Sequence, residues 1–354
     1  MRPGDLAVKA SPAVISLMLA RRLWFQSLAR PRFERAEDVV EWFGAVQSQD
    51  FPAAKWAVAQ RTRSSSDSDV ERAINSGTVL RTHVLRPTWH FAPAKDIRWM
   101  LALTAPRIRA AMVRQGRWFG LTADMFPRAS RTLAKVLSGG RQMTRAELGP
   151  ILGHRTGALG HVLMQSELEG LICSGAVRGK EHTYALLDDR VPATRPIERD
   201  EALALLARRY YRSHGPATLK DFAWWSGLST TEARQGTESA TGLLAETVGG
   251  KTYWLSDRES GSVRTGRVYL LPNFDEFLVA YIDRKHAAEG LDSRVALSNV
   301  VVADGQVVGT WRRTVSASTV EVDVTLFTRL RRAALERAVR RLGAFHGRAA
   351  SFRV

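Results

Sequence analysis

Two glutamines set two residues apart are the first side chains in this sequence whose type and spacing suggest chemistry. They lie in GAVQSQDFPAAKW, residues 44–56. Pro52 disfavours helix at the residue before it, so we expect a helix to break just after Gln49. In extended backbone, side chains two residues apart point to one side, which would bring the amides of Gln47 and Gln49 together. Such a pair can hold a water molecule, one amide accepting its proton and the other fixing its orientation. The alternative is an ordinary polar connector between helices.

Arginines and aromatic residues gather in segments that could contact a polyanion. LRPTWHFA, residues 85–92, carries four side chains that can form hydrogen bonds, beside predicted strands. The alternative there is an edge strand with a buried tryptophan and a hydrogen-bonded histidine. RQGRWFG, residues 114–120, combines arginines with aromatic rings, a combination typical of surfaces that bind nucleic acid. The alternative is a solvated helix face. The candidate DNA-binding residues are Arg86, Thr88, Trp89, His90, Arg114, Arg117, Trp118, Arg312 and Arg313.

Sequence signatures of other chemistry are mostly missing. The chain has no G-x-S-x-G elbow, no P-loop and no Rossmann fingerprint. His154 and His161 lie seven residues apart with no carboxylate at ligand spacing, so a structural or surface role is favoured over metal binding. Cys173 falls in an apolar strand, where a buried, inert thiol is expected. We therefore predict neither a metal nor a cofactor.

Net charge is the strongest compositional feature. The 354 residues include 52 basic and 35 acidic side chains, a net charge of +17, and 44 of the basic residues are arginine. A surface of this kind attracts polyanions, of which nucleic acid is the usual one. The charge is uneven, because residues 196–262 carry −1 while residues 1–100, 101–195 and 263–354 carry +5, +7 and +6. Residues 196–262 are therefore the least suited to binding phosphates.

The apolar runs are short and cysteine is almost unused. No run reaches the roughly 18–20 residues of a membrane helix. AVISLMLA, residues 13–20, leads into two arginines without a cleavage site, so we expect no signal peptide. A single cysteine excludes an intrachain disulfide framework. These features favour a cytoplasmic protein.

One layout of helices followed by a strand pair recurs three times. In the third copy, Thr218 and Asp221 predict a capped helix start, and residues 243–256 predict a hairpin around two glycines. In the second copy, Thr144 and Glu147 predict the same kind of start. Helix, turn, helix and hairpin is the winged-helix pattern.

The two ends of the chain complete this layout. The first copy is looser, with helices expected over residues 13–29 and 36–48 before a strand pair. After residue 263 strands dominate, including apolar runs at 267–274 and 276–282 and a hairpin over 298–314, and a basic amphipathic helix closes the chain. We predict an α+β fold with four parts. They are winged-helix modules over residues 1–100, 101–195 and 196–262, and a small β-barrel-like domain with a C-terminal helix over residues 263–354.

Five stretches together resemble the AlkZ-type winged-helix DNA glycosylases. In order they are AVQSQDFPAAKWAVAQR, VLRPTWHFA, HGPATLKDFAWWSGL, LLPNFDEFLVAYIDR and VVADGQVVGTWRR, and the resemblance runs from about residue 11 to 350. It implies three tandem winged helices and a small β-barrel that form a C-shaped clamp on DNA. The family's crosslink-unhooking branch has a catalytic Gln-x-Gln signature, whose ends fall here on Gln47 and Gln49. The middle position, usually apolar in the family, is Ser48.

The resemblance also implies a reaction. It is that of a monofunctional DNA glycosylase that hydrolyses the N-glycosidic bond of N7-alkylated, cationic purines and unhooks interstrand crosslinks. The setting would be DNA repair or self-resistance to a DNA-alkylating natural product. The partner would be alkylated or crosslinked double-stranded DNA, bound by a nucleoid-associated monomer. Asp50 is expected to cap the helix near Pro52. The alternative is a non-catalytic winged-helix DNA-binding protein with a regulatory or architectural role.

Overall fold

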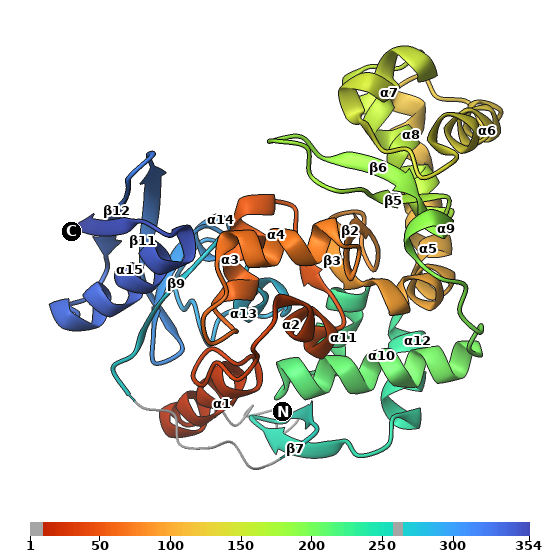
Figure 1. Ribbon diagram of the computed structural model, residues 1–354. Coiled ribbons are helices and arrows are strands. Elements are labelled where there is room, and N and C mark those ends of the chain that lie inside the picture. The colour runs from red at the N-terminus through yellow and green to blue at the C-terminus, as the bar shows by residue number, and fades with distance from the viewer. Residues whose placement is uncertain (1–9, 258–264) are drawn as a thin grey trace.

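The computed structural model describes residues 10–257 and 265–354. Its first part is a small antiparallel sheet framed by helices (Figure 1). The strand order is β1-β3-β2, so β3 is the central strand. The elements are α1 (Pro12–Phe25), α2 (Ala36–Phe43), β1 (Val46–Gln47), α3 (Phe51–Ala59), α4 (Asp67–Asn75), β2 (Val79–His83) and β3 (Trp89–Pro93).

The helix predicted over residues 36–48 is wrong at its C-terminal end. It ends at Phe43, because Gly44 adopts a φ of 82° that only glycine reaches without strain. The following residues then pair with β3. The chain therefore leaves the helix before Gln47, not just after Gln49. The predicted helix over 13–29 likewise ends early, at Phe25.

The second part is more helical. A short 3₁₀ turn, η1 (Ala94–Asp96), leads into the long helix α5 (Ile97–Trp118). The capping box predicted at Thr144 and Glu147 is confirmed at the start of α7. The remaining elements are α6 (Met125–Leu137), β4 (Met143–Thr144), α7 (Arg145–Leu152), α8 (Thr156–Leu168), β5 (Ile172–Ser174), β6 (Thr183–Leu186) and α9 (Leu187–Arg190).

The third part consists of three helices and a two-stranded hairpin. The capping box at Thr218 and Asp221 and the hairpin are both confirmed. The elements are α10 (Arg199–His214), α11 (Leu219–Ser226), α12 (Thr230–Ser239), β7 (Leu244–Val248) and β8 (Lys251–Leu255).

The last part is a curled five-stranded sheet, an open half-barrel, with order β13-β12-β11-β10-β9. The run at 276–282, predicted as a strand, instead begins a helical turn because Asp275 caps its N-terminus. A final strand that the sequence did not predict pairs parallel to β12. The elements are β9 (Val268–Leu271), α13 (Glu276–Val279), α14 (Ser293–Ala296), β10 (Val300–Ala303), β11 (Gln306–Val315), β12 (Thr319–Leu326), α15 (Arg332–His346) and β13 (Ala349–Arg353).

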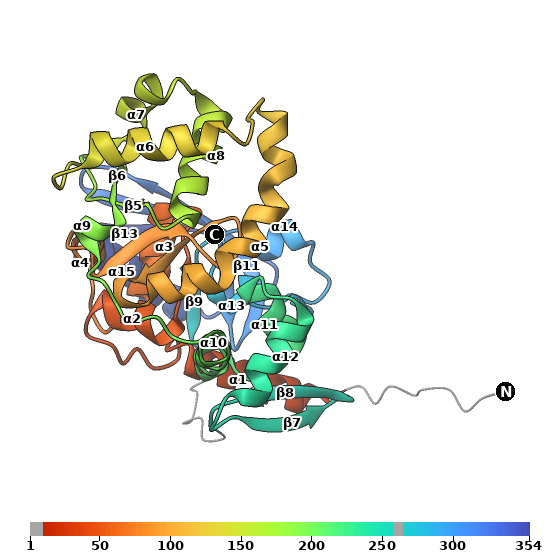
Figure 2. The same ribbon diagram turned by 90° about the vertical axis from the view of Figure 1, so that its right-hand side faces the viewer.

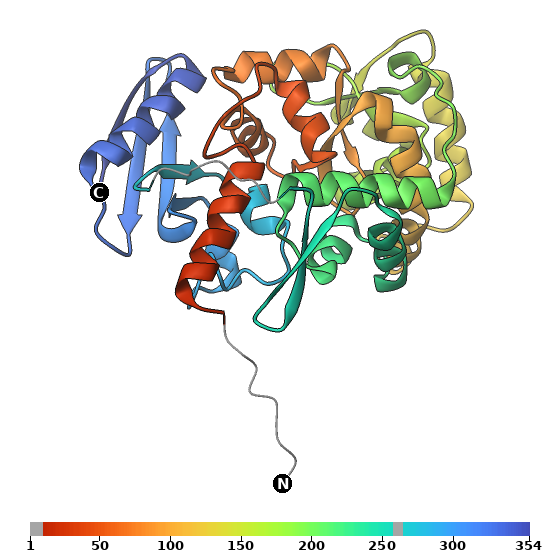
Figure 3. The same ribbon diagram turned by 90° about the horizontal axis from the view of Figure 1, so that it is seen from below.

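Two large hydrophobic clusters join these parts. One combines β2, α5, α10 and α11 with Tyr281, and the other combines α2 and α3 with the half-barrel and α15. In Figures 1 and 3 the half-barrel and α15 lie at one end, and α10 crosses the molecule beside the first sheet. The first sheet is thus packed between distant parts of the chain. No helix in the described ranges has the length and apolar character needed to cross a membrane.

Candidate functional site

Strand pairing fixes the position of Gln47. In β1 it lies opposite His90 of β3, which in turn lies opposite Thr82 of β2. Directly opposed residues share one face of a sheet, so these three side chains form a row across it. The chain continues extended past β1, with the Ser48 N–H donating to the Trp89 carbonyl at 2.8 Å. Asp50 then caps α3, accepting from the Ala53 N–H at 3.1 Å as predicted.

This row is buried and incompletely hydrogen-bonded. Thr82, His90 and Gln47 are 1%, 0% and 7% exposed. Within residues 10–257 and 265–354, Thr82 Oγ1, His90 Nε2 and Gln47 Oε1 each lack a hydrogen-bond partner, as does Ser48 Oγ. Since more than about 90% of buried polar groups in native proteins are paired, such a concentration points to a polar ligand or water at this place.

Glu276 anchors the backbone of Gln47 from the far end of the chain. Its Oε1 accepts from the Gln47 N–H at 2.7 Å, and its Oε2 accepts from Trp225 Nε1 at 3.1 Å and His214 Nε2 at 3.2 Å. Burial tends to raise the pKa of Glu276, but the hydrogen bonds from His214 and Gln47 outweigh it and leave that pKa below its ordinary value. Burial lowers the pKa of His214. The pair is therefore an ionised carboxylate beside a neutral imidazole.

A buried ion pair holds Glu276 in place. Arg61, at the end of α3, contacts both carboxylate oxygens of Asp275, at 2.8 and 2.9 Å. Asp275 also caps α13, and Phe274 before it has a φ of 58°, which is rare for a bulky residue. Strain of this kind persists where the surrounding structure fixes it, and it clusters at functional sites.

Gln49 is exposed, two residues after the buried Gln47. Its Oε1 accepts from the Trp89 N–H at 3.4 Å, and no acceptor in the described residues engages its amide NH₂. Beneath it, Arg81 donates from Nε to the Ser48 carbonyl at 3.1 Å and lies 4.3 Å from the Trp89 ring. Burial lowers the pKa of Arg81 to about 10. Both glutamines therefore lie against β3, one buried and one exposed.

The β2–β3 turn brings further predicted residues next to this row. Its second residue, Leu85, is strained at a φ of 63°. Arg86 is half-buried and its side chain has no hydrogen bond or ion pair within the described chain. Thr88 Oγ1 also lacks a partner, while the Thr88 carbonyl accepts from His90 Nδ1 at 2.9 Å. Burial lowers the pKa of His90 to about 3, so the ring is neutral and its Nε2 carries a lone pair.

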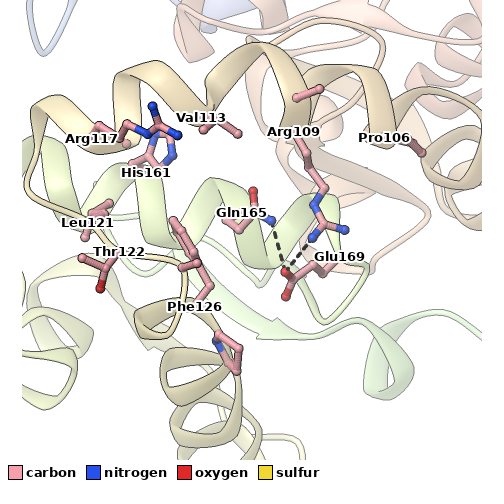
Figure 4. Close-up of a pocket in the computed structure, with 14 residues that line it drawn as sticks. Pro106, Arg109, Val113, Arg117, Leu121, Thr122, Phe126, His161, Gln165 and Glu169 are labelled. Carbon is pink, nitrogen blue, oxygen red and sulfur yellow. Dashed lines mark hydrogen bonds and ion pairs between the residues drawn. The ribbon is translucent and has the colours of Figure 1, made fainter.

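The arginine and tryptophan predicted on α5 lie elsewhere. Trp118 is 74% exposed, with Arg114 5.4 Å from its ring. Arg117, Arg109 and His161 line an open pocket of about 840 Å³ between α5, α6 and α8 (Figure 4). None of the residues lining this cavity belongs to the row at Gln47. The structure does not join the two regions into one site.

The two arginines of β11 face differently. Arg312 is exposed. Burial lowers the pKa of Arg313, and the negative charges of Asp50 and Asp67 partly offset that effect. Arg313 is thus electrostatically coupled to the residue that follows Gln49.

Three site residues were not predicted from the sequence: Glu276, His214 and Asn273. Asn273 Nδ2 donates to Asp50 at 3.1 Å, and its Oδ1 lacks a partner. The available signal was NFDEF, residues 273–277, where an amide and two carboxylates interrupt an apolar segment. Isolated polar residues in such a segment are usually buried with specific partners.

The structure gives no support for a metal site. Across residues 10–257 and 265–354, no three histidine, cysteine or acidic side chains come together as metal ligands. Cys173 is buried, and burial raises the pKa of its thiol to about 12, so it is the inert thiol expected from the sequence.

Comparison with known proteins gives one consistent result. The family model described as DNA glycosylase AlkZ-like matches residues 40–345. A protein named interstrand DNA cross-link repair glycosylase, from Streptomyces sahachiroi, is 25% identical over 303 residues, which cover 78% of this chain and 81% of that protein. The structure of the Streptomyces sahachiroi DNA glycosylase AlkZ superposes with a TM-score of 0.79 at 24% identity, over 98% of this chain and 100% of that one. Because the family model spans most of the chain, including the segments that carry Gln47 and Glu276, this protein belongs to the AlkZ-like DNA glycosylases.

Proposed function

We propose that this DNA glycosylase hydrolyses the N-glycosidic bond of N7-alkylated purines, with Gln47 and Gln49 as its catalytic residues. Breaking this bond passes through a sugar with oxocarbenium character, as in other glycoside hydrolysis. A neutral purine needs protonation to leave, whereas an N7-alkylated purine already carries a positive charge. Such a substrate requires a positioned water more than it requires an acid.

The observation that carries this proposal is the buried Oε1 of Gln47, which has no hydrogen-bond partner in the part of the chain that the structure describes. It can accept one proton of a water molecule. The free NH₂ of Gln49, held by its bond to the Trp89 N–H, can donate to the same water and fix its orientation. Positioning of this kind lowers a barrier by restricting the reactants before the reaction.

The electrostatics around Gln47 support a cationic leaving group. His90 and His214 are neutral because burial lowers the pKa of both, so neither is ready to protonate a base. Glu276, kept ionised by its hydrogen bonds and by the nearby positive charge of Arg86, places a negative charge behind the Gln47 backbone. A negative charge on this side favours the developing sugar cation.

The proposal extends to the domain organisation, the DNA substrate and the cellular role of the protein. We assign the first three parts of the chain, residues 1–100, 101–195 and 196–262, to winged-helix modules, and residues 263–354 to the barrel-like domain of a C-shaped clamp. The protein would bind alkylated duplex DNA as a monomer in the cytoplasm. The name of the Streptomyces sahachiroi relative motivates the further proposal that interstrand crosslinks are substrates. A role in self-resistance to a DNA-alkylating natural product follows from the same chemistry.

The test of substrate class compares charged and neutral bases in one duplex. One strand carries a single 7-methylguanine, and a matched strand carries hypoxanthine at the same position. Abasic sites are revealed by alkaline cleavage. We expect release of 7-methylguanine and no release of hypoxanthine above background. Equal release of both bases would overturn the role assigned to the charge of the leaving group.

A further inference from the structure

Two arginines lie against one tryptophan beside the proposed site. The guanidinium carbons of Arg86 and Arg284 are each 5.7 Å from the ring centroid of Trp224. The ring is fixed because its Nε1 donates to the Val279 carbonyl at 3.0 Å, yet it is 39% exposed. It therefore forms a rigid platform that holds two cations and faces solvent.

Neither guanidinium contacts a carboxylate within the described chain. Arg284 Nε donates to the Leu278 carbonyl at 2.9 Å. Arg86 Nε and Nη2 and Arg284 Nη2 are buried nitrogens that have no hydrogen-bond partner among the described residues. Burial lowers the pKa of both arginines, and the charge of Glu276 on Arg86 offsets this only in part, while the positive charge of Arg284 lowers the pKa of Arg86 further. Asp221 and Asp283 offset the effect on Arg284 in part, without contacting its guanidinium. Buried charges in native proteins are usually paired, so this arrangement calls for an anion.

Backbone strain holds Arg86 in this position. Leu85, the residue before it, has a φ of 63°. The Leu85 carbonyl packs so closely on Gly227 that a Cβ there would lie 2.0 Å from its oxygen. The turn between α11 and α12 thus sets the path of the β2–β3 turn. A bulky residue kept in left-handed backbone by a neighbouring element is a feature associated with function.

We propose that Arg86 and Arg284 together bind one phosphodiester of the DNA strand that carries the target nucleotide. Guanidinium groups offer paired donors that match phosphate oxygens. The charge of Arg86 acts on His90, the strand partner of Gln47, and on Glu276, which accepts from the Gln47 N–H, so a phosphate held here would lie near a nucleotide at Gln47. The inference rests on the proposed placement of the target nucleotide at Gln47.

The surroundings agree with a DNA path across this face. Figure 2 shows α11, which carries Trp224, α14 and the outer half of α5 along the same side of the molecule. The predicted DNA-binding residues Arg114, Arg117 and Trp118 lie on that half of α5. A strand that followed this side would pass the two arginines on its way to α5.

The test measures binding separately from catalysis. The Gln47→Ala/Gln49→Ala protein is titrated by fluorescence anisotropy with a duplex containing a tetrahydrofuran abasic-site analogue, at several KCl concentrations. Arg86→Ala, Arg284→Ala and both together are added to this background. Arg35→Ala removes an exposed arginine paired with Asp38 and is the matched control.

Each single arginine variant should weaken binding about tenfold. Because we propose that both guanidinium groups are needed to hold the phosphate, each single variant should also reduce the slope of log affinity against log salt by about 0.9, the value for one phosphate. If the two arginines share that phosphate, the double variant should lose no more slope than either single variant. Unchanged salt slopes in the single variants would overturn the proposal. A double variant whose slope falls by twice the loss of a single variant would also overturn it, because that loss corresponds to two phosphates.

Lysine variants at the same two positions separate the loss of charge from the loss of paired donors. Should an alanine variant fail to fold, Arg86→Lys and Arg284→Lys keep the charge and should retain the salt slope while binding more weakly, because the paired donors are lost. Wild-type affinity in both lysine variants would overturn the shared-phosphate geometry. Because no base is released in this assay, failure of the proposed reaction would leave the binding result intact and distinguishable.

Discussion

The backbone N–H of Gln47 donates a 2.7 Å hydrogen bond to Oε1 of Glu276, which lies 229 residues later in the chain. This contact joins the first sheet to the segment that leads from the half-barrel into α13. It also gives an ionised carboxylate a direct effect on the backbone of the proposed catalytic motif.

Replacing Glu276 with glutamine should lower both stability and activity. The new NH₂ would face the N–H groups of Trp225 and His214, which now donate to the carboxylate. Hydrogen bonds to a charged group contribute roughly 1.5–3 kcal/mol each, so we expect the free energy of unfolding to fall by about 2 kcal/mol or more. Urea unfolding and single-turnover base release measure the two effects. Glu321→Gln, at an exposed position of β12, is the control, and equal behaviour of the two variants would contradict the anchoring role.

Gly227 and Gly153 form a matched pair for testing the β2–β3 turn. Both close a helix with a φ of 69°, but an added Cβ would lie 2.0 Å from the Leu85 oxygen at Gly227 and within 4 Å of no neighbouring atom at Gly153. Gly153→Ala should cost about 1–2 kcal/mol from backbone strain alone. Gly227→Ala should cost more, by about 2 kcal/mol, and reduce base release because Arg86 must move. Equal losses in thermal unfolding and activity would show that the close contact is unimportant.

Stability should decline in mildly acidic solution. Burial lowers the pKa of His90 to about 3 and the pKa values of His182 and His346 to about 4, all from 6.5. Below pH 6.5 these histidines become protonated in the unfolded chain but stay neutral in the folded chain. The free energy of unfolding therefore falls as the pH falls from 6.5 toward the folded-state pKa values. Each group contributes up to about 1.4 kcal/mol per pH unit in that window.

Urea unfolding at pH 7.5, 6 and 5 measures this decline. His90→Gln should reduce the pH dependence by removing one of the buried histidines whose pKa is lowered. A free energy of unfolding that stays constant from pH 7.5 to 5 would contradict the burial of these rings.

The rate of base release should be nearly independent of pH above about pH 7, where Glu276 is ionised and the buried His90 and His214 are neutral. Glutamine does not titrate, His90 is neutral and Glu276 remains ionised. Single-turnover rates with 7-methylguanine, corrected for spontaneous depurination, measure this profile. A bell-shaped curve with a group titrating near neutrality would show that a titrating residue acts as a general acid or base, which would contradict catalysis by glutamines alone.

Local features of the fold were predictable from the sequence, and contacts between distant segments were not. The capping boxes at Thr144 and Thr218 depend on residues three positions apart. The early end of α2 depends on Gly44 and on pairing with a strand more than forty residues later, which no local pattern reveals. The helical turn after Asp275 was obscured by its apolar composition.

The candidate site divides in the same way. The spacing of Gln47 and Gln49 predicts that the two amides lie on one side of an extended segment. The family resemblance implies that they are catalytic. Glu276 could not be connected to them, because the hydrogen bond crosses most of the chain. Arg284 carries no signal in a sequence with 44 arginines, and only its position on Trp224 distinguishes it.

The most direct test of the central claim is single-turnover release of 7-methylguanine from duplex DNA by the wild type, Gln47→Ala, Gln49→Ala and the double variant. Gln235→Ala, which removes an exposed glutamine of α12, is the control. We predict that the double variant loses about 100-fold or more in rate, with unchanged thermal stability, and that the control keeps the wild-type rate. A double variant that releases 7-methylguanine at the wild-type rate would contradict the assignment of these glutamines as the catalytic pair.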